Sequence, residues 1–397
     1  MAEPAKGSGY HWDLYGPFIA HVLVSQSIVG LTRIATSYRT LELGFSVEVL
    51  GIITGCFALL PIFLAVPLGR WLDRGKDAQA LWIGSFLVLV ACAGFWWHAL
   101  TEATMIFYTL MQGVGYLFVM AGQQTFAVRC SEPFLRDSVF GTYMMSIAIG
   151  QGAGPIIIGF IAAGSTIAPS APLFAISLVG AVVALLVSFA LRPAPPLERA
   201  HRERKKVALM AMLRLHGFVP MILASVMTVT SLDLLAVYMP ILGAERNIDV
   251  AVIGTLLAIR TALSIASRVV FTRLIRAFGR MPLMVFCLFL TATAFAILAS
   301  PAPIWALGVA TAFIGVGLGV AAALALSSIV ELAPPEAQGT AVTLRITGNR
   351  IGQAALPLIA GAVAGATGAA GVMAVIGLSV GASGIAVFTS WLRRPAS

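Results

Sequence analysis

Apolar residues in this chain gather into long runs that short polar segments separate. Twelve of these runs approach the roughly 20 residues that an α-helix needs to cross the hydrocarbon core of a bilayer. None shows the short alternating segments of a membrane β-barrel. The pattern therefore predicts an all-α membrane protein with twelve transmembrane helices, at about 15–36, 47–69, 78–99, 104–128, 139–163, 170–191, 217–241, 250–272, 281–300, 303–331, 339–366 and 368–392.

The second half of the chain repeats the first. The motif Gly150-Gln151-x-x-x-Pro155-x-x-x-Gly159 returns 202 residues later as Gly352-Gln353-x-x-x-Pro357-x-x-x-Gly361. A doubled unit in a chain this apolar is typical of a transporter whose site lies between two pseudo-symmetric six-helix bundles. We expect these bundles at 1–191 and 217–397, with a cytoplasmic linker at 192–216.

Composition supports a membrane location. Hydrophobic residues make up 59% of the chain and charged residues 10%, with a mean hydropathy of +0.96. Soluble globular chains are about 45–50% apolar and about 25% charged. Lipid is therefore expected around most of this chain.

The basic residues indicate an orientation. If the N-terminus is inside, the cytoplasmic segments hold most of the 25 Lys and Arg residues, whereas the outward loops hold only Arg39 and Arg246. This bias predicts that both termini are cytoplasmic. It also accounts for the net charge of +9 without a nucleic-acid partner. We expect a monomer, and a bacterial inner membrane because the chain is compact and has no organelle extension.

No cofactor, metal or nucleotide site is indicated by the sequence. The four cysteines and five histidines lack paired or metal-ligand spacing. A phosphate-binding Gly-x-x-x-x-Gly-Lys loop is also missing from the sequence. Transport would therefore draw on an ion gradient or on exchange of substrates.

Two motifs resemble one known family. The segment Gly69-Arg70-Trp71-Leu72-Asp73-Arg74, between the second and third runs, resembles the Gly-x-x-x-Asp-Arg signature of the major facilitator superfamily. Gly150-x-x-x-Gly154-Pro155 resembles the fifth-helix motif of its proton-coupled efflux branch, although Thr109 stands where that branch has an Arg before Gln112-Gly113. The resemblance covers the whole chain and implies the twelve-helix major facilitator fold of a secondary transporter.

Asp73 is the candidate gate residue within this signature. Near the cytoplasmic end of the second helix, its carboxylate could accept hydrogen bonds from a helix N-terminus in the other half, or pair with Arg74 or Arg129. Such contacts would form in one conformation and break in the other. The simpler alternative is a surface salt bridge worth about 0–1 kcal/mol.

Charged residues inside the predicted helices break the repeat. Five such residues are Arg33, Asp233, Arg260, Arg345 and Arg350, and the matching positions of the other half are uncharged. An ionisable residue at mid-membrane costs upwards of about 2.5 kcal/mol unless it is paired or hydrated. We therefore expect these residues around a central cavity, with polar residues from the same helices: Gln26, Tyr238, Asn349 and Gln353.

The predicted cavity has surplus positive charge. Once Asp233 pairs with Arg33 or Arg260, no acid remains for both Arg260 and Arg350, and a free guanidinium fork suits a carboxylate or phosphate. The alternative is that these arginines cap backbone carbonyls. Arg33 could instead be part of a gate, and Asp233 could be either a permanent partner or the carrier of a coupling proton.

The interpretation we favour is a secondary transporter of a small organic anion, coupled to protons or to an exchanged anion. A proton-coupled exporter of apolar or cationic compounds is the alternative, because of the fifth-helix motif and Asp233. A membrane enzyme is disfavoured, since no nucleophile motif is present. A receptor without transport would not need the internal repeat.

Overall fold

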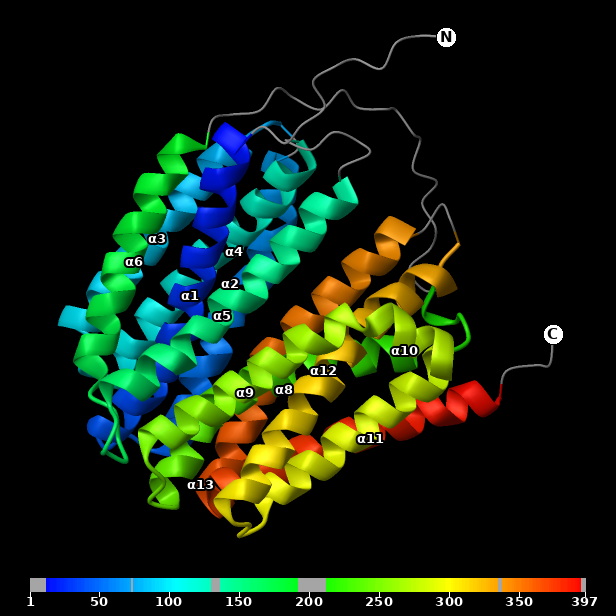
Figure 1. Ribbon diagram of the computed structural model, residues 1–397. Coiled ribbons are helices and arrows are strands. Elements are labelled where there is room, and N and C mark those ends of the chain that lie inside the picture. The colour runs from blue at the N-terminus through cyan, green and yellow to red at the C-terminus, as the bar shows by residue number, and fades with distance from the viewer. Residues whose placement is uncertain (1–11, 73, 130–135, 192–211, 335–337, 394–397) are drawn as a thin grey trace.

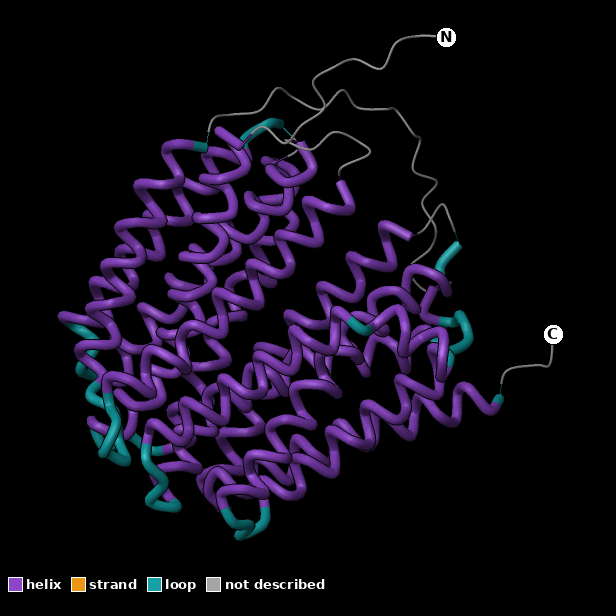
Figure 2. Tube along the Cα trace, in the orientation of Figure 1, coloured by secondary structure: helices purple, strands orange, loops and turns teal. Residues whose placement is uncertain are grey.

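A computed structural model describes residues 12–72, 74–129, 136–191, 212–334 and 338–393. Regular structure in these ranges is entirely helical (Figure 2). The helices are α1 Trp12–Glu42, α2 Val47–Leu72, α3 Asp77–Trp97, α4 Glu102–Arg129, α5 Arg136–Ile161, α6 Ser170–Ala190, α8 Phe218–Glu245, α9 Val250–Val269, α10 Phe271–Phe278, α11 Arg280–Ala299, α12 Ile304–Leu332 and α13 Gln338–Leu392. Eleven of these helices are long and apolar enough to cross a membrane. The all-α membrane fold is therefore confirmed.

Helix α13 contains the last two predicted helices. Its 55 residues would extend about 80 Å if they were straight, far beyond a hydrocarbon core of about 30 Å. The chain turns back at Gly368, whose φ of 68° and ψ of −173° are not helical. Glycine adopts this conformation without a Cβ clash. The predicted break between 366 and 368 therefore falls at the observed turn.

One predicted helix is divided into two in the structure. The apolar run at 250–272 ends early, because α9 stops at Val269 and the short α10 follows it. Within α10, Leu274 and Ile275 pack against the core, whereas Arg273 and Arg276 are exposed. Hydropathy joins the two helices because Val269, Val270 and Phe271 continue the apolar run across the break.

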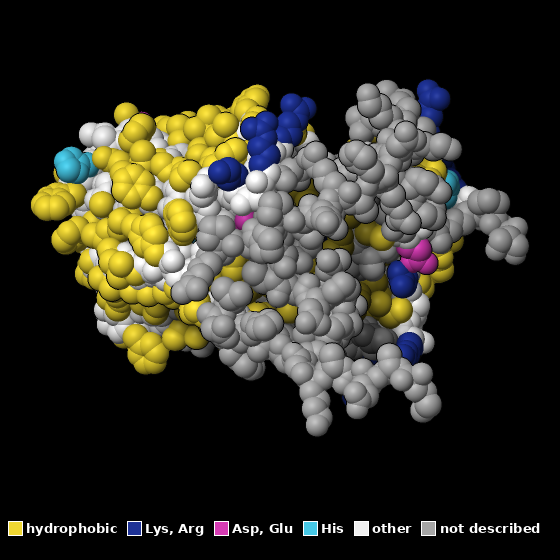
Figure 3. Space-filling model, turned by 90° about the horizontal axis from the view of Figure 1, so that it is seen from above, with side chains coloured by type: hydrophobic (Ala, Val, Ile, Leu, Met, Phe, Trp, Pro, Cys, Tyr) yellow, Lys and Arg dark blue, Asp and Glu magenta, His cyan; other side chains and the backbone are white. Residues whose placement is uncertain are grey.

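The helices form two groups that lie side by side, α1 to α6 and α8 to α13 (Figure 1). We call the end where α1 begins and α13 finishes the proximal end, and the other the distal end. The groups spread apart toward the proximal end in this view. Exposed Lys and Arg side chains gather on the proximal face (Figure 3), whereas Arg39 and Arg246 belong to the distal end.

The repeated motif holds the two groups together at the distal end. A Cβ added to Gly51 of α2 would lie 2.5 Å from the Pro357 carbonyl oxygen of α13. One added to Gly254 of α9 would lie 2.6 Å from the Pro155 carbonyl oxygen of α5. Both distances are too short for a real Cβ, so only glycine permits either crossing. The two copies of the motif therefore occupy equivalent places, as the repeat predicts.

Hydrogen bonds add to the closure at the distal end. Asp249 is the N-cap of α9, and one of its carboxylate oxygens accepts the Ala251 N–H at 2.6 Å. Its other oxygen accepts the Gly164 N–H from the opposite group at 2.8 Å. The Val250 N–H also donates to the Ser165 carbonyl at 2.8 Å. One acid therefore caps its own helix and ties the two groups together.

Candidate functional site

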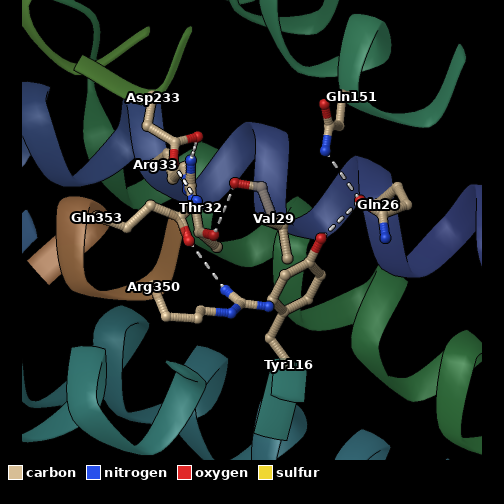
Figure 4. Close-up of polar contacts among 9 residues, drawn as sticks. All are labelled: Gln26, Val29, Thr32, Arg33, Tyr116, Gln151, Asp233, Arg350 and Gln353. Carbon is tan, nitrogen blue, oxygen red and sulfur yellow. Dashed lines mark hydrogen bonds and ion pairs between the residues drawn. The ribbon is translucent and has the colours of Figure 1, made fainter. Parts of the chain in front are cut away.

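An ion pair joins the two groups of helices within the membrane-spanning region. Arg33 of α1 donates to the carboxylate of Asp233 of α8, and each side chain is 19% exposed (Figure 4). The Arg33 guanidinium also lies over the Phe57 ring of α2, 4.7 Å from its centroid. The sequence-based prediction that Asp233 pairs with Arg33 or Arg260 is confirmed for Arg33.

Gln353 connects this ion pair to a second arginine. Its amide nitrogen donates to the other oxygen of Asp233 at 2.6 Å, and its amide oxygen accepts from Arg350 at 3.1 Å. Arg350 also donates to the Met120 sulfur at 3.5 Å, and its side chain extends toward Tyr116 (Figure 4). An amide and a thioether therefore hold this guanidinium, and neither carries charge.

Arg260 of α9 is the third guanidinium of the region. It donates to the hydroxyl of its neighbour Thr261 at 2.8 Å, while its Nε atom is buried without a hydrogen-bond partner. Across the described part of the chain, no carboxylate lies within ion-pair distance of Arg260 or Arg350. One carboxylate and three guanidinium groups therefore leave surplus positive charge. No contact joins Arg260 to Arg350 directly.

Gln26 holds a second polar cluster, on α1. Its amide oxygen accepts from the Tyr116 hydroxyl and from the Gln151 amide, both at 3.1 Å (Figure 4). Its amide nitrogen is buried without a partner in the described structure. Gln151 and Gln353 are the repeated glutamines, and each reaches the first helix of its own half. Their acceptors differ, since Gln353 meets a carboxylate.

The remaining candidate ligands lie apart from this network. Asn349 accepts from the Ser225 hydroxyl at 3.2 Å, and Arg345 donates to the same hydroxyl at 2.8 Å. Tyr238 is completely buried in the hydrophobic core, and its hydroxyl has no partner among the described residues. Their role as ligands stays a prediction.

The structure describes the surroundings of the motif glycines but not of all the candidate gate residues. Gly150 and Gly154 face α1, where added Cβ atoms would lie 2.7 Å from Gln26 and 2.8 Å from Gly30. They are therefore packing residues of the first half, where small side chains let the two helices approach closely. The gate stays a prediction, because Asp73 and the side chain of Arg129 lie outside the described residues; Gly69 and Arg74 are exposed.

A small cavity of about 30 Å³ lies beside the ion pair. It is bounded by five helices from both groups, α1, α2, α4, α8 and α13. Its polar lining includes residues that the sequence analysis did not select as ligands: Thr36, Thr54, Thr109 and Gln112. The available signal is their polarity within apolar helices.

Comparison with known proteins gives one family. The family model described as Major Facilitator Superfamily matches residues 17–238 and 221–397. No curated protein matches the chain by sequence.

Several solved structures share the fold. The D-xylose-proton symporter is 13% identical, with a TM-score of 0.78 over 98% of both chains. The nucleoside transporter NupG is 13% identical, with a TM-score of 0.76 over 96% of this chain and 100% of that one. A bacterial homologue of the human lysosomal transporter Spinster, inward-facing and occupied, is 12% identical, with a TM-score of 0.76 over 98% of both. At such identities the likeness shows the fold alone.

Proposed function

Because the chain belongs to the major facilitator superfamily, it is a secondary transporter, and we propose that its cargo is a small organic anion. The observation that carries this proposal is the pair of guanidinium groups, Arg260 and Arg350, that lack a carboxylate partner in the described structure. The carboxylate or phosphate of a cargo molecule is the natural counter-ion for such groups, and binds a guanidinium fork in two-point fashion.

Charge balance also favours an anionic cargo. Arg33 and Asp233 neutralise each other, so Arg260 and Arg350 contribute the surplus. A cation would add to this surplus at a depth where water is scarce, whereas an anion would reduce it. The proposed ligand set is Arg260 and Arg350, with Gln353 positioning the latter.

The ion pair between Arg33 and Asp233 is the proposed coupling element. It joins helices of different halves, so movement of one half against the other would separate the two charges. A proton on Asp233, or the exchanged anion on Arg33, would then replace the lost partner. Both forms of coupling are compatible with a cycle in which ATP takes no part.

The proposed orientation places the proximal end in the cytoplasm, because that face carries the exposed Lys and Arg residues (Figure 3). The crossings at Gly51 and Gly254 would then close the outward side. The moving bodies would be residues 1–191 and 217–397, and the membrane a bacterial inner membrane. Asp73 would hold the cytoplasmic gate in the opposite state.

A thermal-shift screen of the purified protein tests the cargo class. Small carboxylates such as lactate, succinate and benzoate are compared with tetraphenylphosphonium and ethidium, because a bound ligand raises the unfolding midpoint by mass action. We expect stabilisation by carboxylates alone. Stabilisation by the two cations alone would favour the alternative, a proton-coupled exporter of apolar or cationic compounds.

A further inference from the structure

The cavity beside the ion pair offers several hydrogen-bond acceptors to an occupant. Its volume of about 30 Å³ exceeds the roughly 10–15 Å³ that one water molecule needs. Asp233 and Gln353 line it from the second half, and Arg33, Gln112 and three threonines line it from the first, where the Arg33 guanidinium already donates to Asp233. The cavity is therefore polar on both sides and is large enough for one small group.

The three threonines, Thr36, Thr54 and Thr109, can only accept hydrogen bonds in this cavity. Each has a single hydroxyl proton, and each donates it to a backbone carbonyl of its own helix, at 2.8, 2.7 and 2.8 Å respectively. A hydroxyl that has used its proton keeps two acceptor lone pairs. The hydroxyl oxygens of these three threonines can therefore only accept hydrogen bonds from an occupant of the cavity.

Gln112 adds to the acceptors in the lining. Its amide nitrogen donates to the Thr32 hydroxyl at 2.6 Å, and the proton of that hydroxyl goes to the Ile28 carbonyl at 2.8 Å. This chain of donors fixes which end of the amide is nitrogen and leaves its oxygen as an acceptor. An occupant that only accepts hydrogen bonds would leave these oxygens unsatisfied, which is costly in a buried site.

Gln353 places the cavity next to the proposed anion site. One end of its amide bonds Asp233 at the cavity, and the other end bonds Arg350. Only the Gln353 amide therefore separates a carboxylate bound to Arg350 from a donor group in the cavity. We propose that the cargo is a hydroxycarboxylate, with its carboxylate on Arg350 and its hydroxyl donating to the threonine oxygens; this rests on the proposed anion transport.

A hydroxyl fits the charge of the site better than an ammonium does. An ammonium group would bring a further positive charge to a region where two guanidinium groups already lack a carboxylate. It would also compete with Arg33 for Asp233. A hydroxyl supplies the required donor without either penalty.

The test compares matched ligands on the purified full-length protein. Two sets are used: propionate, lactate, 2-methoxypropionate and alanine, and succinate, malate, 2-methoxysuccinate and aspartate. Dissociation constants come from intrinsic tryptophan fluorescence. We expect the better hydroxy acid to bind roughly fivefold to tenfold more tightly than its parent acid, the effect of one net hydrogen bond. The methoxy acids, which lack the proton, should show no gain.

Variants locate the effect within the cavity. Thr36→Val, Thr54→Val and Thr109→Val keep the shape of the side chain and remove the acceptor, so at least one should abolish the preference for the hydroxy acid. Thr311→Val is the matched control, since Thr311 is a buried threonine that also donates to its own helix, at Leu307, outside this cavity.

The outcomes separate the two proposals. If no carboxylate in either set binds, the proposed anion transport is wrong. If parent and methoxy acids bind as tightly as hydroxy acids, or if amino acids bind more tightly, the hydroxycarboxylate inference is wrong while anion transport stands. A preference unchanged in all three threonine variants would also overturn it.

Discussion

Asp233 connects the two halves at the scale of single residues. Its carboxylate receives Arg33 from one half and Gln353 from the other, and Gln353 in turn holds Arg350. Sequence reasoning predicts the arginine partner, because a lone acid among buried bases must pair. Neither hydropathy nor spacing predicts the bridge through Gln353 or the threonine cavity, since the direction of a hydrogen bond becomes visible only in the folded chain.

A double-mutant cycle tests the ion pair. Arg33→Gln or Asp233→Asn alone should lower the free energy of unfolding by about 1–3 kcal/mol, less than a fully buried pair because each side chain keeps some exposure. The double variant should lose less than the sum of the two, because neither charge is then left alone. Thermal unfolding of the four proteins in one detergent measures this. Additive losses would mean that the two charges do not depend on each other.

Gln353→Glu tests whether Arg350 is free for cargo. The new carboxylate would stand at the Arg350 guanidinium and act as its counter-ion, so carboxylate binding should weaken by about tenfold or more. The variant also loses the amide hydrogen bond to Asp233 and sets two carboxylates side by side, so the free energy of unfolding is measured as well. Gln151→Glu is the control at the symmetric position, where Gln26 has an unpartnered amide nitrogen that can donate to the new acid. Equal affinities of the two variants for lactate and malate would count against the role of Arg350.

At the scale of elements, glycine crossings set how closely the halves approach. Helix α5 meets α9 and α2 meets α13 through the same repeated motif. Sequence reasoning identifies these elements well, because long apolar runs and a repeat are strong signals. It places their ends less well: α1 continues to Glu42, past the predicted end near 36, because Glu42 accepts hydrogen bonds from Ser170 and the Arg39 guanidinium lies over the Phe174 ring.

Gly51→Ala and Gly254→Ala should each open the distal end. An added Cβ would lie within 2.6 Å of a backbone oxygen of the other half, so the closed crossing becomes strained. Spin labels at Thr101 and Ser300, exposed distal positions in different halves, would report longer distances in a protein without other cysteines. Gly141→Ala, where no atom lies within 4 Å, is the control. Unchanged distances in both variants would show that these crossings do not hold the closed state.

Two variants of Asp249 separate its role as a helix cap from its role in closing the distal end. Asp249→Ser keeps an oxygen for the Ala251 N–H but loses the second one that accepts from Gly164, whereas Asp249→Ala loses both. Both variants should lengthen the distances between the distal labels. Only the alanine variant should lose the additional cap energy of about 1 kcal/mol. If the serine variant keeps the wild-type distances, Asp249 serves only its own helix.

At the scale of the whole molecule, one repeated scaffold carries an asymmetric set of charges. The repeat accounts for two bundles, the matched crossings and the glutamines at equivalent places. The charges inside the helices are confined to positions where the repeat fails, and Arg33, Asp233 and Arg350 make contacts between the two bundles. In the proposed transport cycle, alternating access would expose the same surplus of guanidinium groups to each side in turn, as carriage of one anion per cycle requires.

Transport by arginine variants tests this account most directly. Wild type, Arg260→Lys, Arg350→Lys and the control Arg268→Lys, an exposed arginine on the same helix as Arg260, are reconstituted in proteoliposomes. Uptake is measured for the labelled carboxylate that stabilises the wild type most. Lysine keeps the charge but loses the two-point fork, so uptake at low concentration should fall about tenfold or more in the first two variants and stay unchanged in the control. Full uptake by both Arg260→Lys and Arg350→Lys would contradict the proposal that these guanidinium groups bind the cargo.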